Sequence, residues 1–456
     1  MSKILFRSLL LVVVLTSFGI STQAQSSKSK VTPQNALQHY LHNGDTTFHY
    51  ELKDKYEMPG VTAYNLKLTS QKWREFTWTH QLTIFVPKVI NSDGALLFIT
   101  GGSVKDGEPN WNGKEDDMFK NMSKIAEKNK AIVAVVRQTP NQPLFQDLTE
   151  DALISYTLHQ FKNDNDYTWP LLFPMVKSAV RSMDAIQQFS KKSLNKNVKR
   201  FVISGASKRG WTTWLTGAND KRVAAIAPMV IDVLNMPVNL QYQIKAWNEY
   251  SIQIEDYVKL GIPQSAESAS GKAINQMIDP YSYRSTLTMP KMIFIGTNDE
   301  YWVVDAIKNY YDQIPGRNMI CYTPNAGHDL GDKQRAFTSL SAFFGMTMSG
   351  KPYPACNWTV NTSNKKANLS VKATPDVLVD AKVWSATSTD MKFTKAEWTS
   401  RPIDIKTKSL ITTSEEFPKD GFKAFYVDLK YKDPNGGEYT QSTRMFVADN
   451  KELKLK

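Results

Sequence analysis

Ser207 lies in the stretch with the clearest chemical signal in this sequence, VKRFVISGASKRGWTTWLTG at residues 198–217. Residues 200–204 are rich in β-branched and aromatic side chains and predict a buried strand. Small residues follow, and from Gly210 onward the spacing indicates a helix. A strand, a sharp turn and a helix with serine at the apex is the geometry of a nucleophile elbow. Such a turn exposes the hydroxyl and places a helix N-terminus beneath developing negative charge.

Histidine is the usual base for a serine nucleophile, and His328 is the histidine whose position suits that role. It follows the predicted buried strand at 318–323, in the turn PNAGHD. Loops at the carboxyl ends of parallel strands gather the site of an open α/β sheet, so we expect His328 near Ser207. The other histidines lie in an N-terminal segment, an alternating edge strand and a charged helix: His39, His42, His49, His80 and His159.

An acid that orients the histidine is expected between Ser207 and His328 in chain order, after a strand end. Asp299 fits this position, in the sequence GTND that follows the buried run at 291–296. Its carboxylate would accept the imidazole N–H and stabilise the imidazolium. Glu300, next to it, and Asp232, after the preceding strand, are the alternatives.

The backbone N–H of Lys208 is the first expected donor of an oxyanion hole, because it follows the nucleophile. The second donor is expected from the loop after the strand at 95–100, at Gly102 or Ser103. Glycine lets backbone amides approach an oxyanion without an intervening side chain.

The elbow departs from GxSxG, because Arg209 stands two residues after the serine and Gly210 comes one step later. A bulky cation there needs space or a carboxylate partner such as Glu150 or Asp151. Lys208 or Arg209 therefore either holds an acidic substrate group or forms a structural ion pair beside the elbow, and we favour the ion pair. The candidate substrate-binding residues are Arg209, Glu300 and Trp302.

The order of elements predicts an α/β fold. Two alternating runs at 64–70 and 78–87 indicate antiparallel edge strands, and six continuous apolar runs indicate buried parallel strands. Helical patterns alternate with those runs, as expected for a mostly parallel eight-stranded sheet with helices on both faces. The predicted buried strands are 95–100, 131–136, 200–204, 223–230, 291–296 and 318–323, and the predicted helices include 149–161, 174–189, 306–313 and 332–344. This count and order match an α/β-hydrolase, with the elbow on the fifth strand.

Four further segments complete the predicted organisation. Residues 1–24 are predicted to be a signal peptide and 25–60 a linker that wraps onto the domain, with the α/β-hydrolase domain at 61–355. Residues 235–289 are too long for a simple connection and predict either a cap over the site or a packed peripheral insertion. Residues 356–456 have short alternating runs with turn clusters between them, which predict a β-sandwich of the immunoglobulin or fibronectin type.

The composition is that of a globular protein, and the N-terminal residues predict export from the cytoplasm. Lys3 and Arg7, the apolar run 9–18 and the TQA at 22–24 have the pattern of a secretory signal, so we expect a secreted or periplasmic protein. No later run is long enough to span a bilayer. The net charge of +12 is spread along the chain and favours acidic partners. No nucleic-acid-binding module accompanies it, so we do not expect the chain to bind nucleic acid.

The two cysteines, Cys321 and Cys356, could form one disulfide in an oxidising compartment or remain buried free thiols. The chain has no CxxC or HExxH motif, so the sequence predicts no metal site, and it indicates no cofactor. The oligomeric state is left open.

Several stretches together resemble the PhoPQ-activated pathogenicity-related protein family: TSQKW, TGG, QTPNQPLF, EDALISYT, WPLLFPMVKSAVRSMD, SGASKRGWTTWLTGAND, GTNDEYW and NAGHDL. The resemblance runs from about residue 40 into the C-terminal segment and implies a secreted α/β-hydrolase-like domain followed by a β-sandwich. By position, Ser207, Asp299 and His328 carry over as the triad, and the charged elbow agrees with the family. The resemblance implies no particular reaction, because members are known mainly as secreted virulence- or growth-related proteins.

The sequence therefore predicts a secreted serine hydrolase that cleaves an ester or peptide bond in a small-molecule, peptide or glycan-linked substrate. Two alternatives remain: a signalling or virulence-associated factor that keeps a hydrolase scaffold without turnover, and a carbohydrate-associated esterase whose sandwich docks on glycans. Exposed aromatic residues such as Trp384 or Trp398 would support the last of these.

Overall fold

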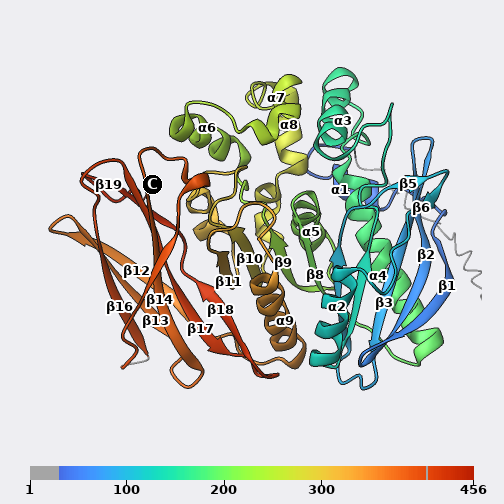
Figure 1. Cartoon of the computed structure of the whole chain (residues 1–456). Helices are drawn as coiled ribbons and strands as arrows, with labels where there is room; N and C mark the ends of the chain where they lie inside the picture. The colour runs from blue at the N-terminus through green and yellow to red at the C-terminus, as the bar shows by residue number, and fades with distance from the viewer. Residues whose placement is uncertain (1–29, 407–408, 456) are drawn as a thin grey trace, which may run out of the picture. The chain divides into compact units, whose positions relative to one another are not determined.

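A large mixed β-sheet forms the centre of the structure, a computed structural model that describes residues 30–406 and 409–455 (Figure 1). The strands of its first part are β1 (His49–Met58), β2 (Val61–Trp73), β3 (Phe76–Pro87), β4 (Gly94–Ile99), β7 (Ile132–Val136), β8 (Arg200–Ala206), β9 (Val223–Met229), β10 (Lys291–Gly296) and β11 (Asn318–Thr323). They lie in the order β1-β2-β3-β7-β4-β8-β9-β10-β11. The pairs from β7 to β11 are parallel, and β1, β2 and β3 add an antiparallel edge.

This sheet is that of an α/β-hydrolase, as the sequence predicts. The buried parallel strands have nearly every side chain covered, which explains their continuous apolar runs. Their parallel direction places the loops after β4, β8, β9, β10 and β11 at one edge of the sheet. Each predicted triad residue lies in one of these loops.

Residues 49–58 correct the prediction of an N-terminal linker, because they form β1, paired with β2. The strand was missed because its apolar side chains are few and a bulge between Leu52 and Asp54 interrupts their alternation. Those side chains are Tyr50, Leu52, Tyr56 and Met58. A short helix, α1 (Ala36–Leu41), precedes it.

Helices cover both faces of the sheet (Figure 1). Two of them, α2 (Asp117–Asn129) and α9 (Gln334–Ser349), pack on each other and share one hydrophobic core with β4, β7 and β8. On the other face, α4 (Leu172–Leu194) packs against β2, and α5 (Lys208–Asn219) packs against α4, β8 and β9. The loop after β4 carries the two-stranded β5 (Val104–Lys105) and β6 (Glu108–Pro109).

The predicted insertion at 235–289 is mostly helical and lies with α3 (Glu150–Asp164) beyond one end of the sheet (Figure 1). Its elements are α6 (Met236–Trp247), η1 (Ile252–Ile254), α7 (Glu255–Lys259), α8 (Ala269–Ile278) and η2 (Pro280–Thr286). Both α7 and α8 contact α3. The helix predicted at 306–313 is instead two short 3₁₀ turns, η3 (Ala306–Asn309) and η4 (Tyr311–Gln313). The two turns are separated at Tyr310, which has a φ of −145°. Its buried side chain donates a hydrogen bond to Asp232.

The C-terminal segment is antiparallel β-structure that continues the central sheet. Its elements are β12 (Cys356–Ser363), β13 (Lys366–Ala373), β14 (Leu378–Ser388), η5 (Phe393–Lys395), β15 (Thr399–Pro402), β16 (Leu410–Glu416), β17 (Phe422–Lys432), β18 (Glu438–Ser442) and β19 (Phe446–Asp449). β12, β13 and β16 form a separate three-stranded sheet. β18 pairs with β11 through Ile320 and Ser442, so the strands β18-β17-β14-β15 extend the hydrolase sheet. A separate sandwich domain beginning at residue 356 stays a prediction.

Cys321 in β11 and Cys356 in β12 are free thiols in the structure, which contains no disulfide between them. Burial raises the pKa of the Cys321 thiol. Among the described residues, no helix is long and apolar enough to cross a membrane. The predicted signal peptide at 1–24 lies outside those residues.

Gly210 provides a test of how closely α5 approaches the sheet. A Cβ added there would lie 2.6 Å from the Met229 carbonyl oxygen and 3.0 Å from Ile231 Cγ2. We expect Gly210→Ala to lower the free energy of unfolding by about 1–3 kcal/mol, because the Met229 carbonyl cannot move without shifting β9. Gly113→Ala is the matched control, since an added Cβ there meets nothing within 4 Å. Urea denaturation of both variants measures the difference, and equal stabilities would contradict the close packing.

Candidate active site

Ser207 occupies a strained turn between β8 and α5. Its backbone has φ 58° and ψ −125°, in the region of positive φ that residues with side chains rarely adopt. Ser207 N–H donates to the Met229 carbonyl at 2.9 Å, and Trp211 N–H donates to the Ser207 carbonyl at 2.9 Å. Gly205 permits the close approach, because a Cβ there would lie 2.9 Å from the Ile99 carbonyl oxygen. These contacts hold the serine at the apex of an elbow.

The structure brings Ser207, His328 and Asp299 together in one hydrogen-bonded chain. Ser207 Oγ lies 2.8 Å from His328 Nε2, and His328 Nδ1 lies 2.9 Å from Asp299 Oδ2. The three residues come from the loops after β8, β11 and β10. With a proton on Nδ1, Nε2 is free to accept the serine proton, which is the arrangement that activates a hydroxyl for attack.

Asp299 is buried, and its loop is fixed to the histidine loop by further bonds. Burial raises the pKa of the Asp299 carboxyl, and the hydrogen bond from His328 lowers it in part. Asn298 N–H donates to the Ala326 carbonyl at 2.9 Å, and Tyr301 N–H donates to Asp299 Oδ1 at 2.9 Å. Glu300 accepts the backbone N–H of His328 at 3.3 Å, and its role in substrate binding stays a prediction. Its carboxylate therefore supports the histidine loop.

Tyr301 contributes a contact that the sequence analysis missed. Its ring stacks on the His328 imidazole with centroids 4.0 Å apart and 28° between the planes. Its hydroxyl reaches Asp151 Oδ2 at 3.5 Å. The stack limits rotation of the imidazole, and the aromatic residue two positions after Asp299 was the available sequence signal.

Lys208 and Arg209, the two cations after the nucleophile, each have a carboxylate partner on α3. The Arg209 guanidinium donates to both Glu150 oxygens at 2.7 and 2.6 Å, and its Nε donates to the Thr139 carbonyl at 2.5 Å. Lys208 Nζ lies 2.6 Å from Asp151 Oδ2. The predicted ion pairs are therefore present. The Arg209 guanidinium already donates to Glu150 and to the Thr139 carbonyl, which does not favour the predicted role of Arg209 in substrate binding.

The predicted oxyanion-hole residues lie on both sides of the elbow. Lys208 is the first residue of α5, where backbone N–H groups lack partners within the helix. The loop with Gly102 and Ser103 follows β4, which pairs with β8 through Ile99 and Gly205. Gly102 has φ 143°, and Ser103 accepts hydrogen bonds from Asn110. Their role as donors to an oxyanion stays a prediction.

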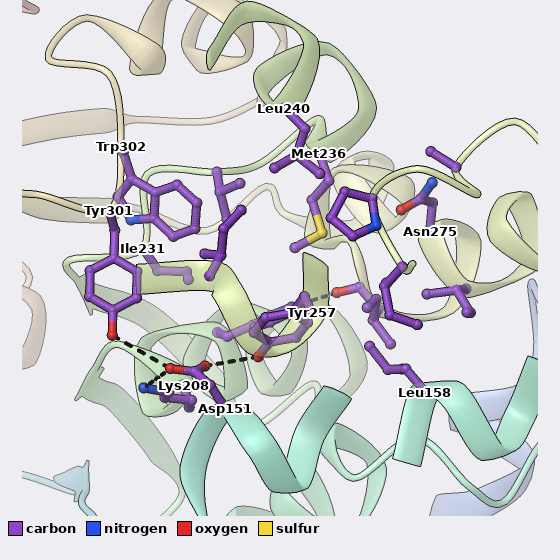
Figure 2. A pocket seen from close by; sticks show the side chains of 18 of the residues that line it. Asp151, Leu158, Lys208, Ile231, Met236, Leu240, Tyr257, Asn275, Tyr301 and Trp302 are labelled. Atoms are coloured by element: carbon purple, nitrogen blue, oxygen red, sulfur yellow. Dashed lines mark hydrogen bonds and ion pairs between the residues drawn. The ribbon is translucent and has the colours of Figure 1, made fainter. Parts of the chain in front are cut away.

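A pocket opens beside Ser207 under the helical insertion (Figure 2). One wall carries Asp151, which accepts hydrogen bonds from Lys208 Nζ, from Tyr257 Oη at 2.9 Å and from Tyr301. Trp302, a predicted substrate-binding residue, lines the same pocket. The remaining lining is largely apolar: Leu158, Trp211, Ile231, Val233, Met236, Leu240, Ile254, Ile262, Pro263, Ala266, Ile274 and Ile278, with the amide of Asn275. The insertion therefore forms part of the wall of the site.

A second serine–histidine contact lies in the core of the domain. His80 Nε2 is 2.9 Å from Ser70 Oγ and 3.2 Å from Ser178 Oγ, and its Nδ1 is 2.9 Å from the Arg137 carbonyl. Burial lowers the pKa of His80 to about 4. With no exposed surface, this group holds β3 to α4 and offers no access to a substrate. Among the described residues, no cluster of His, Cys, Asp or Glu could hold a metal ion.

The fold and the order of the site residues define an α/β-hydrolase. The chain belongs to the PhoPQ-activated pathogenicity-related protein family, whose model matches residues 37–393. The curated relative Autocrine proliferation repressor protein A of Dictyostelium discoideum is 29% identical in an alignment of 448 residues that covers 90% of this chain and 90% of the relative.

Two solved structures are similar to this chain at low sequence identity. Acetyl xylan esterase 1 from Thermoanaerobacterium sp. is 16% identical with a TM-score of 0.49, covering 70% of this chain and 94% of that one. An S-formylglutathione hydrolase from Agrobacterium tumefaciens is 12% identical with a TM-score of 0.44, covering 65% of this chain and 99% of that one.

Arg209→Lys tests whether this residue supports the elbow or binds substrate. Lysine cannot reproduce the two-pronged contact to Glu150, and Glu150 is partly exposed, so we expect the free energy of unfolding to fall by about 1–3 kcal/mol. The folded variant should react with a fluorophosphonate at close to the wild-type rate. Chemical denaturation and labelling kinetics measure the two effects. Unchanged stability together with a raised KM would instead assign Arg209 to substrate binding.

Asp232, the alternative acid, should make folding stability depend on pH. It is 1% exposed, accepts a hydrogen bond from Tyr310 Oη at 2.7 Å, and burial raises its pKa to about 8. The unfolded chain loses this proton near pH 4, whereas the folded chain keeps it. The free energy of unfolding therefore falls as pH rises from about 4 to about 8. We expect Asp232→Asn to flatten that decline in urea denaturation, and an unchanged slope would contradict the assignment.

Proposed function

We propose that this chain is a secreted serine hydrolase that cleaves an ester or peptide bond through an acyl-enzyme. The observation that carries the proposal is the hydrogen-bonded chain from Ser207 Oγ through His328 to buried Asp299. A serine on a strained turn, a histidine and a buried carboxylate from three separate loops form the set that nucleophilic catalysis requires. Secretion rests on the signal pattern of residues 1–24.

In the acylation half of the reaction, Ser207 Oγ attacks the carbonyl carbon while His328 Nε2 takes its proton. Asp299 holds the other imidazole N–H and stabilises the imidazolium that forms. The negative charge on the carbonyl oxygen lies near the first turn of α5, where the Lys208 N–H is a donor, together with Gly102 or Ser103 from the opposite loop. His328 then returns the proton to the leaving alcohol or amine as the bond breaks.

In the second half, water replaces the leaving group. His328 Nε2 takes a proton from the water as its oxygen attacks the acyl carbon, and the proton passes to Ser207 Oγ when the acid departs. Tyr301 keeps the imidazole plane fixed through both halves by its stacking contact. It acts as a positioning residue.

The alternative of a non-catalytic signalling factor is favoured by one comparison. The curated relative bears the name of a repressor of proliferation, which describes a biological effect and no reaction. Of the two aromatic residues that would support a carbohydrate-associated esterase, Trp398 is only 2% exposed and packs on Tyr426 and Phe393. Trp384 is partly exposed, so this alternative has the support of one of the two.

Labelling by a fluorophosphonate probe tests the proposal. We expect the full-length mature protein to be labelled and Ser207→Ala to lose labelling by at least ~10³-fold, because removing the nucleophile removes the covalent bond. Ser204→Ala is the matched control: it removes a hydroxyl from the same strand, one that donates to the Ala227 carbonyl at 2.7 Å. That variant should label like wild type. Absence of wild-type labelling, or equal labelling of Ser207→Ala, would reject the hydrolase and favour the signalling factor.

A further inference from the structure

The pocket beside Ser207 combines an apolar lining with a wall whose charges are already compensated. Asp151 forms an ion pair with Lys208 and accepts hydrogen bonds from the hydroxyls of Tyr257 and Tyr301. Neither the Asp151 carboxylate nor the Lys208 ammonium is therefore free to pair with a substrate. Lys208 also lies over the Tyr301 ring, with Nζ 5.7 Å from its centroid. An apolar group of a substrate can therefore pack against the pocket lining, whereas a charged group would find no free ionic partner among the lining residues.

The side of the nucleophile on which the pocket lies decides which part of a substrate enters it. Among the described residues, the lining includes Ser207 but does not include His328. The leaving group must lie beside His328, because Nε2 gives it a proton. The acyl group stays bonded to Ser207 Oγ through both halves of the reaction. Tyr301, which stacks on the imidazole, lines the pocket at its histidine end, and apolar side chains of α3, α6 and α8 line the rest. That apolar remainder is the part that can hold the acyl group.

The pocket has a volume of about 80 Å³. Figure 2 shows Met236 and Leu240 of α6 on one side of the pocket and Leu158 of α3 on another, so the insertion supplies much of the surface an acyl chain would contact.

We infer that the site is selective for substrates with an uncharged, apolar acyl chain longer than acetyl, held between α3 and the helices of the insertion. This inference rests on the proposed serine hydrolase activity. Each methylene moved from water into the pocket favours the transition state roughly fourfold. A six-carbon acyl ester should therefore exceed an acetyl ester in kcat/KM by roughly 10²-fold.

The test uses the full mature protein with p-nitrophenyl esters from acetyl to dodecanoyl. Leu240→Trp places a larger side chain against the acyl chain and should lower kcat/KM for the hexanoyl ester at least tenfold, while the acetyl ester stays within about threefold of wild type. Val238→Trp is the matched control on the same helix, because Val238 is 44% exposed and does not line the pocket. Ala266→Phe, at a partly exposed lining position, is a second variant should Leu240→Trp not fold.

The outcomes separate this inference from the proposed function. Labelling at Ser207 with no dependence on acyl length would overturn the acyl pocket and leave the hydrolase intact. Dependence on the chain length of the alcohol in a series of alkyl acetates, with none on the acyl group, would also overturn it. Failure of both labelling and ester hydrolysis would overturn the hydrolase and the pocket together. A rise from acetyl to hexanoyl that Leu240→Trp removes and Val238→Trp keeps would support it.

Discussion

The backbone of Ser207 is the constraint on which the rest of the site depends. A serine at φ 58° and ψ −125° is strained by about 1–3 kcal/mol, and such a conformation persists only where surrounding contacts over-determine it. The Met229 carbonyl of β9 accepts the Ser207 N–H. Gly205 and Gly210 let β8 and α5 approach their neighbours more closely than a Cβ at either position would permit. The turn directs Oγ out of the sheet toward His328 Nε2, 2.8 Å away. Relaxing the turn would move the nucleophile away from its base.

The charged residues after the nucleophile extend this constraint to the pocket. A buried cation needs a partner, and both cations of the elbow find one at the start of α3. Asp151 then accepts hydrogen bonds from Tyr257 on the insertion and from Tyr301 above the imidazole. One carboxylate thus links the elbow, the histidine loop and the insertion. The charged elbow has a structural explanation in these pairs, and the pocket beside it keeps a largely apolar lining.

The sequence predicted the elements and residues whose signals are local. Continuous apolar runs predicted the parallel strands, and the order of Ser207, Asp299 and His328 after strand ends predicted which side chains meet. β1 was missed because a bulge between Leu52 and Asp54 interrupts the alternation of its few apolar side chains. The helical segment predicted at 306–313 is present as two 3₁₀ turns that break at Tyr310, whose hydroxyl donates to Asp232, a residue far away in sequence. Tyr257 was missed because nothing near it in the chain indicates that it faces Asp151.

In the proposed reaction, Ser207 carries the acyl group between the two halves. Rapid acid quench of the protein during turnover of p-nitrophenyl hexanoate, followed by peptide mass spectrometry, detects that intermediate. We expect a hexanoyl group on Ser207 at early times, formed with a stoichiometric burst of p-nitrophenol, and its absence in Asp299→Asn or His328→Ala. An acyl group on another residue, or turnover with no acylated peptide and no burst, would show that the acyl group does not pass through Ser207.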